Sequence, residues 1–365
     1  MGIKAFIKNN IMPLVAFAAA AVTMLFVPLD SSYAGYLDYR TLTCLFCVLA
    51  VVCALRDVNF FYVLANRIVA RFSNVRSCIL VLVYITFIGS MLITNDTALL
   101  TFLPLGYFVL QAAGKEEHLA FTFIMQNMAA NLGGMLTPFG NPQNLYLYTR
   151  FGISTPEFVR ILLPSFLVSV ALITLCCLFV KPAPLELRGE KPEFKVRPTA
   201  FYLCLFAFTV AVVFRAIPFW AGLIVIPLAL MLTDRHALKS VDYSLLLTFV
   251  FFFVFAGNMA RIDTVRDFFS MLMGKDTLLY SALCSQLISN VPSAILLSQF
   301  TDNYPQLLIG VNIGGAGTLI ASLASLITFR EYLHHKPDDT RGFIIKFSIY
   351  NFAFLAILLV FSHLI

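Results

Sequence analysis

Two short polar motifs interrupt long apolar stretches of this sequence, one in each half of the chain. The first is Thr-Asn-Asp-Thr at 94–97, and the second is Ser-Asn-Val-Pro-Ser at 289–293. Hydroxyl, amide and carboxylate oxygens suit a hard cation, and an amide N–H can also donate to an anion. A break inside hydrocarbon costs roughly several kcal/mol unless an ion, a solute or water satisfies the freed backbone groups. The motifs therefore predict a site for a small solute and a cation.

A second pair of breaks follows these motifs. Asn-x-Gly-Gly occurs at 131–134 and again at 312–315. The first continues as Thr-Pro-Phe-Gly-Asn-Pro-Gln-Asn at 137–144, which favours an unwound loop with free carbonyls over a regular helix. Half-helix N-termini beside such a loop offer N–H groups to an anion. The second continues as Ala-Gly-Thr at 316–318 and has fewer side-chain ligands, so we expect unequal sites. Alternatively, the glycine pairs only allow close helix packing.

Asp96 is the ionisable residue that stands out in the first motif. A carboxylate inside a membrane is costly, and such groups usually bind or release a cation or a proton. The alternative is that Asp96 caps a helix that begins at Thr97. Asp57 and Asp263, by contrast, stand beside arginines near the expected membrane surfaces and are interpreted as structural.

The composition indicates that lipid surrounds most of this chain. Of its 365 residues, 60% are hydrophobic and 12% are charged, whereas a soluble domain has about 45–50% apolar and about 25% charged residues. The sequence contains no His-Glu-x-x-His motif and no phosphate-binding loop, which argues against an intramembrane enzyme and a primary pump. We predict no enzyme activity and no cofactor.

We predict an all-α polytopic membrane protein with about nine crossings, two re-entrant hairpins and a cytoplasmic N-terminus. The crossings are expected at about 11–28, 40–55, 119–150, 157–180, 199–216, 219–233, 243–258, 306–330 and 342–364. In this orientation seven of the 25 Lys and Arg residues face outside, namely Arg40, Arg150, Arg160, Arg215, Arg261, Arg266 and Lys275. The positive-inside rule supports this orientation. It also explains the net charge of +6, so no nucleic-acid partner is predicted.

The two halves of the chain repeat one order of elements: span, span, interfacial arm, hairpin, broken span and span. The predicted boundaries are 1–180 for the first unit (hairpin about 77–112, broken helix about 119–150), 181–198 for a cytoplasmic linker, 199–216 for a connecting span, and 219–365 for the second unit (hairpin about 277–300, broken helix about 306–330). The interfacial arms are expected near 56–76 and 261–274. Because one unit starts inside and the other outside, we predict inverted repeats, with which many secondary transporters build a site at the membrane midplane.

Two Asn-containing hairpin tips, each followed by an Asn-x-Gly-Gly break, resemble the ion transporter superfamily over nearly the whole chain. This group includes divalent anion–sodium symporters, citrate transporters, arsenite permeases and one type of sodium–proton antiporter. The Gly-Asn-Pro-Gln-Asn stretch at 140–144 is similar to a bacterial branch of anion or citrate-like permeases. In the symporters, Ser-Asn-Thr at each tip contributes to sodium sites and to binding of substrate carboxylates. Asn95 and Asn290 match the central Asn, whereas Asp96 and Val291 replace the closing Thr.

The resemblance implies a cation-coupled permease for a small anion, such as a di- or tricarboxylate, in the bacterial inner membrane. It also implies a homodimer and elevator-type movement. From position we expect solute contacts at Asn95, Thr97, Asn141, Asn144, Asn290, Ser293 and Thr318. For the coupling ion, Na+ or H+, we expect Thr94, Asn95, Asp96, Asn131, Gly133, Thr137, Ser289, Asn290, Asn312 and Gly314.

Alternatives to this function stay open. Asp96 adds negative charge where a dicarboxylate would sit, and no membrane-embedded Arg or Lys is evident in the sequence as a counter-ion. A Na+/H+ antiporter and an arsenite efflux permease are therefore the alternatives. A fixed channel is less favoured, because paired hairpins suit alternating access.

Overall fold

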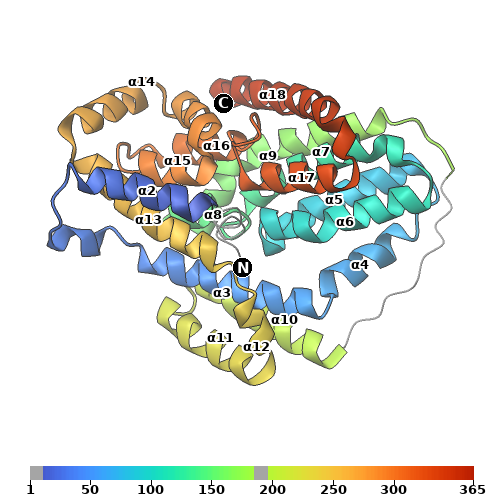
Figure 1. Ribbon diagram of the computed structural model, residues 1–365, viewed down its shortest axis with the longest axis horizontal. Coiled ribbons are helices and arrows are strands. Elements are labelled where there is room, and N and C mark those ends of the chain that lie inside the picture. The colour runs from blue at the N-terminus through green and yellow to red at the C-terminus, as the bar shows by residue number, and fades with distance from the viewer. Residues whose placement is uncertain (1–10, 185–195) are drawn as a thin grey trace.

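The computed structural model describes residues 11–184 and 196–365, which form α-helices and short 3-10 turns with no β-strand among them (Figure 1). The helices of the first half are α2 Ile11–Met24, α3 Tyr39–Asp57, α4 Phe60–Val69, α5 Val75–Ile93, α6 Asn95–Ala112, α7 Leu119–Gly133, α8 Pro142–Arg150 and α9 Thr155–Leu178. Those of the second half are α10 Val196–Val213, α11 Phe219–Thr233, α12 Arg235–Lys239, α13 Tyr243–Arg261, α14 Asp263–Ile288, α15 Asn290–Leu297, α16 Tyr304–Ile313, α17 Leu323–His335 and α18 Thr340–Leu364. The predicted linker at 181–198 falls largely outside the described residues.

Six helices in the described parts of the chain are long and apolar enough to cross a membrane: α3, α5, α9, α10, α13 and the segment Pro337–Leu364 that contains α18. Five of them match predicted crossings, and α5 is the first limb of the predicted hairpin at 77–112. Large apolar side chains point outward, among them Phe179 at 79% exposure and Leu232 at 87%. Polar side chains such as Asn127 and Asn312 are buried instead. This inside-out distribution is that of a multi-pass membrane protein.

Each polar motif separates two helices that pack against each other. Only Thr94 lies between α5 and α6, and only Ser289 lies between α14 and α15. Both residues have a positive φ with an extended ψ, 72° and 147° at Thr94 and 74° and 155° at Ser289. This region is strained for a residue with a side chain, at a cost of roughly 1–3 kcal/mol. The two tips therefore share one unusual backbone conformation.

Hydrogen bonds to the broken helices hold both strained tips. The Asn95 N–H donates to the carbonyl of Gly140 over 2.9 Å, and the Asn290 N–H donates to the carbonyl of Ala321 over 2.9 Å. Gly140 precedes α8, and Ala321 precedes α17. Each tip is thus attached at the point where the second part of a broken helix is about to begin.

A capping residue stands at the start of α5 and another at a kink within α14. Asn74 Oδ1 accepts the Arg76 N–H over 2.9 Å at the start of α5. In the second half, α14 is not one continuous helix, because Asp276 has φ −163° and ψ 92°. Asp276 Oδ1 accepts the Leu279 N–H over 2.9 Å, and its Oδ2 lies 2.8 Å from His363 Nε2 at the end of α18. The predicted arm at 261–274 corresponds to the part of α14 before this kink.

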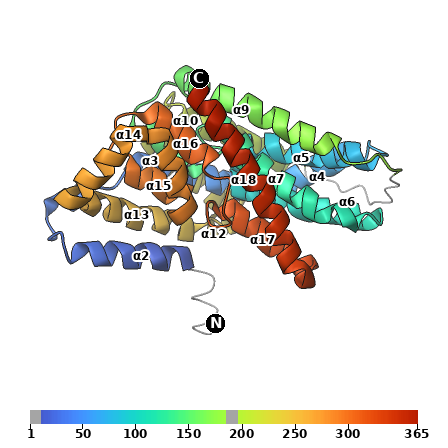
Figure 2. The same cartoon turned by 90° about the horizontal axis from the view of Figure 1, so that it is seen from above.

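The two halves contact each other in matching pairs. Helix α6 of the first half packs on α17 of the second, and α15 of the second half packs on α8 of the first. Likewise α2 packs on α13, and α11 packs on α3. The segments α8, α15, α16 and α17 gather at the centre of the molecule (Figure 1). Figure 2 shows α18 crossing this region, where it contacts α7, α9 and α16.

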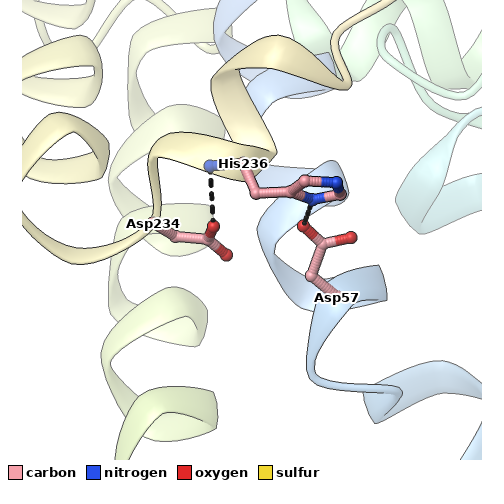
Figure 3. A group of neighbouring side chains, drawn as sticks. All are labelled: Asp57, Asp234 and His236. Atoms are coloured by element: carbon pink, nitrogen blue, oxygen red, sulfur yellow. Dashed lines mark hydrogen bonds and ion pairs between the residues drawn. The ribbon is translucent and has the colours of Figure 1, made fainter.

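A polar contact at the periphery joins α3 to α12. His236 Nδ1 lies 2.7 Å from Asp57 Oδ2, and Asp234 Oδ1 accepts the backbone N–H groups of His236 and Ala237 over 3.1 Å each (Figure 3). Asp57 therefore pairs with a histidine and not with the neighbouring arginine. Asp263 pairs with Arg266 over 2.7 Å within the arm. Both contacts suit the structural interpretation of these carboxylates.

Candidate functional site

Asparagines from both halves form one buried hydrogen-bond network at the centre. Asn95 Nδ2 donates to Asn131 Oδ1 over 3.2 Å. Asn141 Nδ2 donates to the Asn131 carbonyl over 3.1 Å and to Asn312 Oδ1 over 3.2 Å. Asn312 Nδ2 donates to Asn144 Oδ1 over 2.6 Å. Because these side chains are at most 3% exposed, the network fixes the first tip, both breaks and α8 relative to one another.

Side-chain amides also occupy the carbonyls that the breaks leave free. Asn144 Nδ2 donates to the carbonyls of Gly134, Met135 and Thr137 over 3.1–3.3 Å. In the second half the amide of Gln286, on α14, binds the free carbonyls in the same way. Its Nε2 donates to the carbonyls of Gly314 and Ala316, and its Oε1 accepts the Thr318 N–H over 2.8 Å. Both unwound segments are therefore held by the protein itself.

Glycine at 140 is required by the close approach of two backbone segments. A Cβ atom at this position would lie under 3.0 Å from the carbonyl oxygen of Gly134, and a backbone atom cannot move aside as a flexible side chain can. We expect Gly140→Ala to lower the free energy of unfolding by about 1–3 kcal/mol, as overpacking does, and to weaken solute binding.

Gly274→Ala is the matched control for this prediction. No heavy atom lies within 4 Å of a Cβ placed there, and alanine in a helix is favoured over glycine by up to about 1 kcal/mol. Thermal unfolding of the purified variants measures both effects. Equal unfolding temperatures for the two variants would contradict the tight approach at Gly140.

A cavity of about 320 Å³ lies between the two hairpin tips. Its lining comes from α2, α6, α8, α13, both tips, α15 and α17, and includes Met12, Asn95, Asp96, Gln143, Asp242, Thr248, Ser289, Asn290 and Arg330. The charged residues are Asp96, Asp242 and Arg330. A few amides, hydroxyls and charges among apolar side chains such as Phe252 and Leu326 suit recognition of one small polar solute.

Asp96 presents a carboxylate oxygen that the protein leaves unpaired. Helix α6 begins at Asn95 with Thr94 as its N-cap residue, so the expectation that Asp96 caps a helix beginning at Thr97 is wrong. Asp96 Oδ1 is buried and has no hydrogen-bond partner within residues 11–184 and 196–365. Asp242 differs, because its Oδ1 accepts the Leu245 N–H over 2.9 Å and caps α13. Asp96 therefore offers the cavity a buried carboxylate oxygen without a partner among the described residues.

Comparison with known proteins agrees with this arrangement. Residues 5–308 match the model of the citrate transporter family. The chain belongs to the citrate transporter family. It is 34% identical over 298 residues to an uncharacterized transporter of Methanocaldococcus jannaschii, which covers 80% of this chain and 81% of that protein. It is 30% identical over 315 residues to the inner membrane protein YbiR of Escherichia coli (strain K12), covering 84% and 83%.

A shorter similarity reaches a plant protein. The silicon efflux transporter of Oryza sativa subsp. japonica is 30% identical over 155 residues, which are 42% of this chain and 31% of that protein. The expected membership in the ion transporter superfamily is confirmed by the family match and the two longer similarities. As a member of the citrate transporter family with apolar crossing helices, the chain is a multi-pass membrane transporter.

Some of the predicted ligands lie in the cavity of this citrate transporter family member, and others lie beside it. Asn95, Asp96, Ser289 and Asn290 line the cavity. The other predicted residues do not belong to its lining among the described residues: Thr94, Thr97, Asn131, Gly133, Thr137, Asn141, Asn144, Ser293, Asn312, Gly314 and Thr318. Many of these support the tips. Thr94 Oγ1 donates to Thr97 Oγ1 over 3.1 Å, for example, and Ser293 Oγ donates to the carbonyl of Ser289 over 2.8 Å. Their roles as ligands stay predictions.

Sequence reasoning missed four residues of the site. Asp242 and Arg330 stand next to charged loops in the sequence, so they resemble surface residues. Gln143 lies within the polar stretch at 137–144, in which Asn141 and Asn144 are the expected ligands. Gln286 carried a usable signal, because a lone amide in an apolar helix three residues before the tip at Ser289 needs a partner.

Proposed function

We propose that the chain is a secondary active transporter that moves a small anion with Na+ or H+, and that the cavity between the two tips binds both. The observation that carries this proposal is the meeting of two strained Asn-containing tips, one from each half, around a cavity with a buried carboxylate oxygen that has no partner among the described residues. Strain of this kind persists where the surrounding structure holds it and is frequent at ligand sites. Asp96 takes the coupling ion, and the tips and amides take the solute.

Inverted repeats with re-entrant hairpins are part of this proposal. The shared backbone conformation at Thr94 and Ser289, the matching N–H bonds to Gly140 and Ala321, and the exchanged helix pairs all support a pseudo-two-fold relation between the halves. In transporters of this kind the substrate site lies near the membrane midplane, at the interface between the repeats. We include elevator-type movement, a homodimer and the bacterial inner membrane in the proposal, on the family resemblance.

The cavity faces the cytoplasm in the predicted orientation. Its lining includes Met12, Asp242 and Arg330, and the predicted topology places all three at cytoplasmic ends of their helices. The conformation described is therefore inward-facing in this proposal. Arg330 also supplies the cation that was not evident from the sequence, which favours an anionic solute.

We expect Arg330→Gln to weaken the binding of an anionic solute by roughly 10- to 100-fold, because a hydrogen bond to a charged group contributes about 1.5–3 kcal/mol. Arg341→Gln is the control, since Arg341 lies at the start of α18 and outside the cavity lining. Titration of each purified variant with the solute measures the effect. An affinity unchanged by Arg330→Gln would contradict a role for this guanidinium in anion binding.

A second candidate is efflux of a hydroxylated oxyacid of low charge. Two carboxylates line the cavity against one guanidinium, which disfavours a highly charged di- or tricarboxylate. The rice relative is named a silicon efflux transporter. A Na+/H+ antiporter that uses Asp96 without any anion, and an arsenite efflux permease, are the remaining alternatives.

Gradient-driven uptake into proteoliposomes tests these proposals. Purified protein is reconstituted, and a sodium or proton gradient is imposed with citrate, succinate, orthosilicic acid or arsenous acid as the solute. Accumulation that requires one of the gradients supports the coupled transporter and names its solute class. Sodium movement driven by a proton gradient, with no solute added, favours the antiporter. Equal solute fluxes with and without the gradients would contradict coupling.

A further inference from the structure

Gln143 is a buried amide of the cavity whose side chain has no hydrogen-bond partner in the described part of the chain. It lies in the first turn of α8 directly after Pro142, and both residues line the cavity. Gln143 is 1% exposed. Neither its Nε2 nor its Oε1 has a hydrogen-bond partner among the residues described. An unsatisfied buried polar group costs roughly 1–3 kcal/mol. A ligand in the cavity that hydrogen-bonds to both amide atoms would remove this cost.

The neighbouring amides differ from Gln143 in this respect. Asn95 donates to Asn131 and accepts the Asp96 N–H. Asn144 donates to three loop carbonyls and accepts from Asn312. Their hydrogen-bonding capacity is largely used in holding the tips and breaks. Gln143 is the cavity-lining amide with both ends unused, so it is the one best placed to contact a solute.

The unused atoms define the chemistry of the solute. Nε2 needs an acceptor, and Oε1 needs a donor. A fully ionised carboxylate offers acceptors only, so it satisfies Nε2 and leaves Oε1 unpaired. The buried Asp96 Oδ1 in the same cavity is a further acceptor, which the coupling ion satisfies under the proposed function. Oε1 of Gln143 is then the acceptor that remains for a hydroxyl of the solute.

We propose that Gln143 contacts the transported solute and selects for a hydroxyl group next to an oxygen acceptor. Hydroxycarboxylates and hydroxylated oxyacids carry this pair of groups, whereas plain dicarboxylates do not. The inference rests on the proposed function, because it assumes that the cavity binds the transported solute. It narrows the solute class to molecules whose hydroxyl can donate to Gln143 Oε1, a hydrogen bond that a deoxy analogue cannot make.

Matched pairs of probes test this inference on the full-length purified protein. Citrate is compared with tricarballylate, and malate with succinate, since each pair differs by one hydroxyl; orthosilicic acid is an uncharged hydroxyl-only probe. Affinities are measured from ligand-dependent thermal stabilisation with Na+ and at several pH values. A site built around a hydroxyl rejects the analogue that lacks it, so we expect the hydroxylated member to bind at least about tenfold more tightly.

Two variants assign the discrimination to Gln143. Gln143→Met keeps the length of the side chain and removes both polar atoms, so the preference for the hydroxyl is expected to disappear. Gln143→Glu keeps the shape and the acceptor but replaces the donor by a charge. We expect the Gln143→Glu protein to stop binding the carboxylate probes and still to bind orthosilicic acid. Gln306→Met is the control, because Gln306 is exposed and lies outside the cavity lining.

The outcomes separate this inference from the function it rests on. Probes that bind in an Asn95-dependent way, but equally well with and without the hydroxyl, would overturn the role of Gln143 and leave the transporter proposal standing. The same holds if Gln143→Met keeps the wild-type preference. Binding of no probe under any of these conditions would contradict the proposed function and, with it, this inference.

Discussion

Asn95→Ala and Asn290→Ala are each expected to reduce solute transport by about 100-fold or more while the protein still inserts and folds. Loss of the Asn95 amide leaves Asn131 Oδ1 and the Asp96 N–H without their partners, at a cost of roughly 1–3 kcal/mol for each buried group. A factor of 100 corresponds to about 2.7 kcal/mol in the transport barrier. Asn290 holds the equivalent place at the second tip. Uptake into proteoliposomes, normalised to folded protein, measures the loss.

Asn351→Ala is the matched control for the tip variants. Asn351 is a fully buried asparagine on α18 whose Nδ2 donates to the carbonyl of Phe347 over 2.9 Å, and it does not line the cavity. We expect this variant to lose stability but to keep the transport rate per folded molecule. Wild-type transport in both Asn95→Ala and Asn290→Ala would remove the tips from the site.

Asp96→Asn is expected to separate solute movement from the ion gradient. Asparagine has the size of aspartate but neither binds a proton near neutral pH nor carries the charge that attracts Na+. Because Asp96 Oδ1 has no partner in the described protein, the substitution breaks no observed contact of that oxygen. Gradient-driven accumulation should therefore fall by about 100-fold or more, whereas solute exchange at equal concentrations on both sides should persist.

Asp242→Asn is the control for the loss of a negative charge, because it removes one from the same cavity at another position. Asp242 lines the same cavity, but its Oδ1 caps α13 through the Leu245 N–H, and asparagine caps a helix about as well as aspartate. We expect this variant to keep its dependence on the gradient. Normal accumulation by Asp96→Asn, or loss of coupling in both variants alike, would show that Asp96 is not the coupling residue.

Local sequence features were sufficient to predict where the helices break. The segment 77–112, expected as a hairpin, contains α5 and α6, which meet at Thr94, and α7 and α16 end at Gly133 and Ile313, inside the two Asn-x-Gly-Gly motifs. Polar residues, proline and glycine within apolar stretches are strong signals, because hydrocarbon offers no partners to a freed backbone group. The positions of these breaks therefore follow from the sequence, whereas five of the nine expected crossings coincide with described helices long and apolar enough to span a membrane.

Contacts between distant segments could not be predicted in this way. Asn141 and Asn312 meet although 171 residues separate them, and nothing in either motif identifies the other as a partner. The same applies to Arg330, which resembles a loop residue until α17 places it in the cavity. The positive φ at Thr94 runs against local preference, since a β-branched residue rarely adopts it. These contacts and this backbone conformation depend on tertiary packing and hydrogen bonds, which the local sequence does not specify.

The central claim is that solute and coupling ion bind together in the cavity between the tips. Thermal unfolding of the purified protein, with solute alone, ion alone and both, tests it most directly, because coupled ligands must strengthen each other's binding reciprocally. We expect the solute to stabilise the protein more when its coupling ion is present, and we expect Asn95→Ala and Asn290→Ala to abolish this gain. Stabilisation by the two ligands that is simply additive, or that survives in both tip variants, would contradict a shared site.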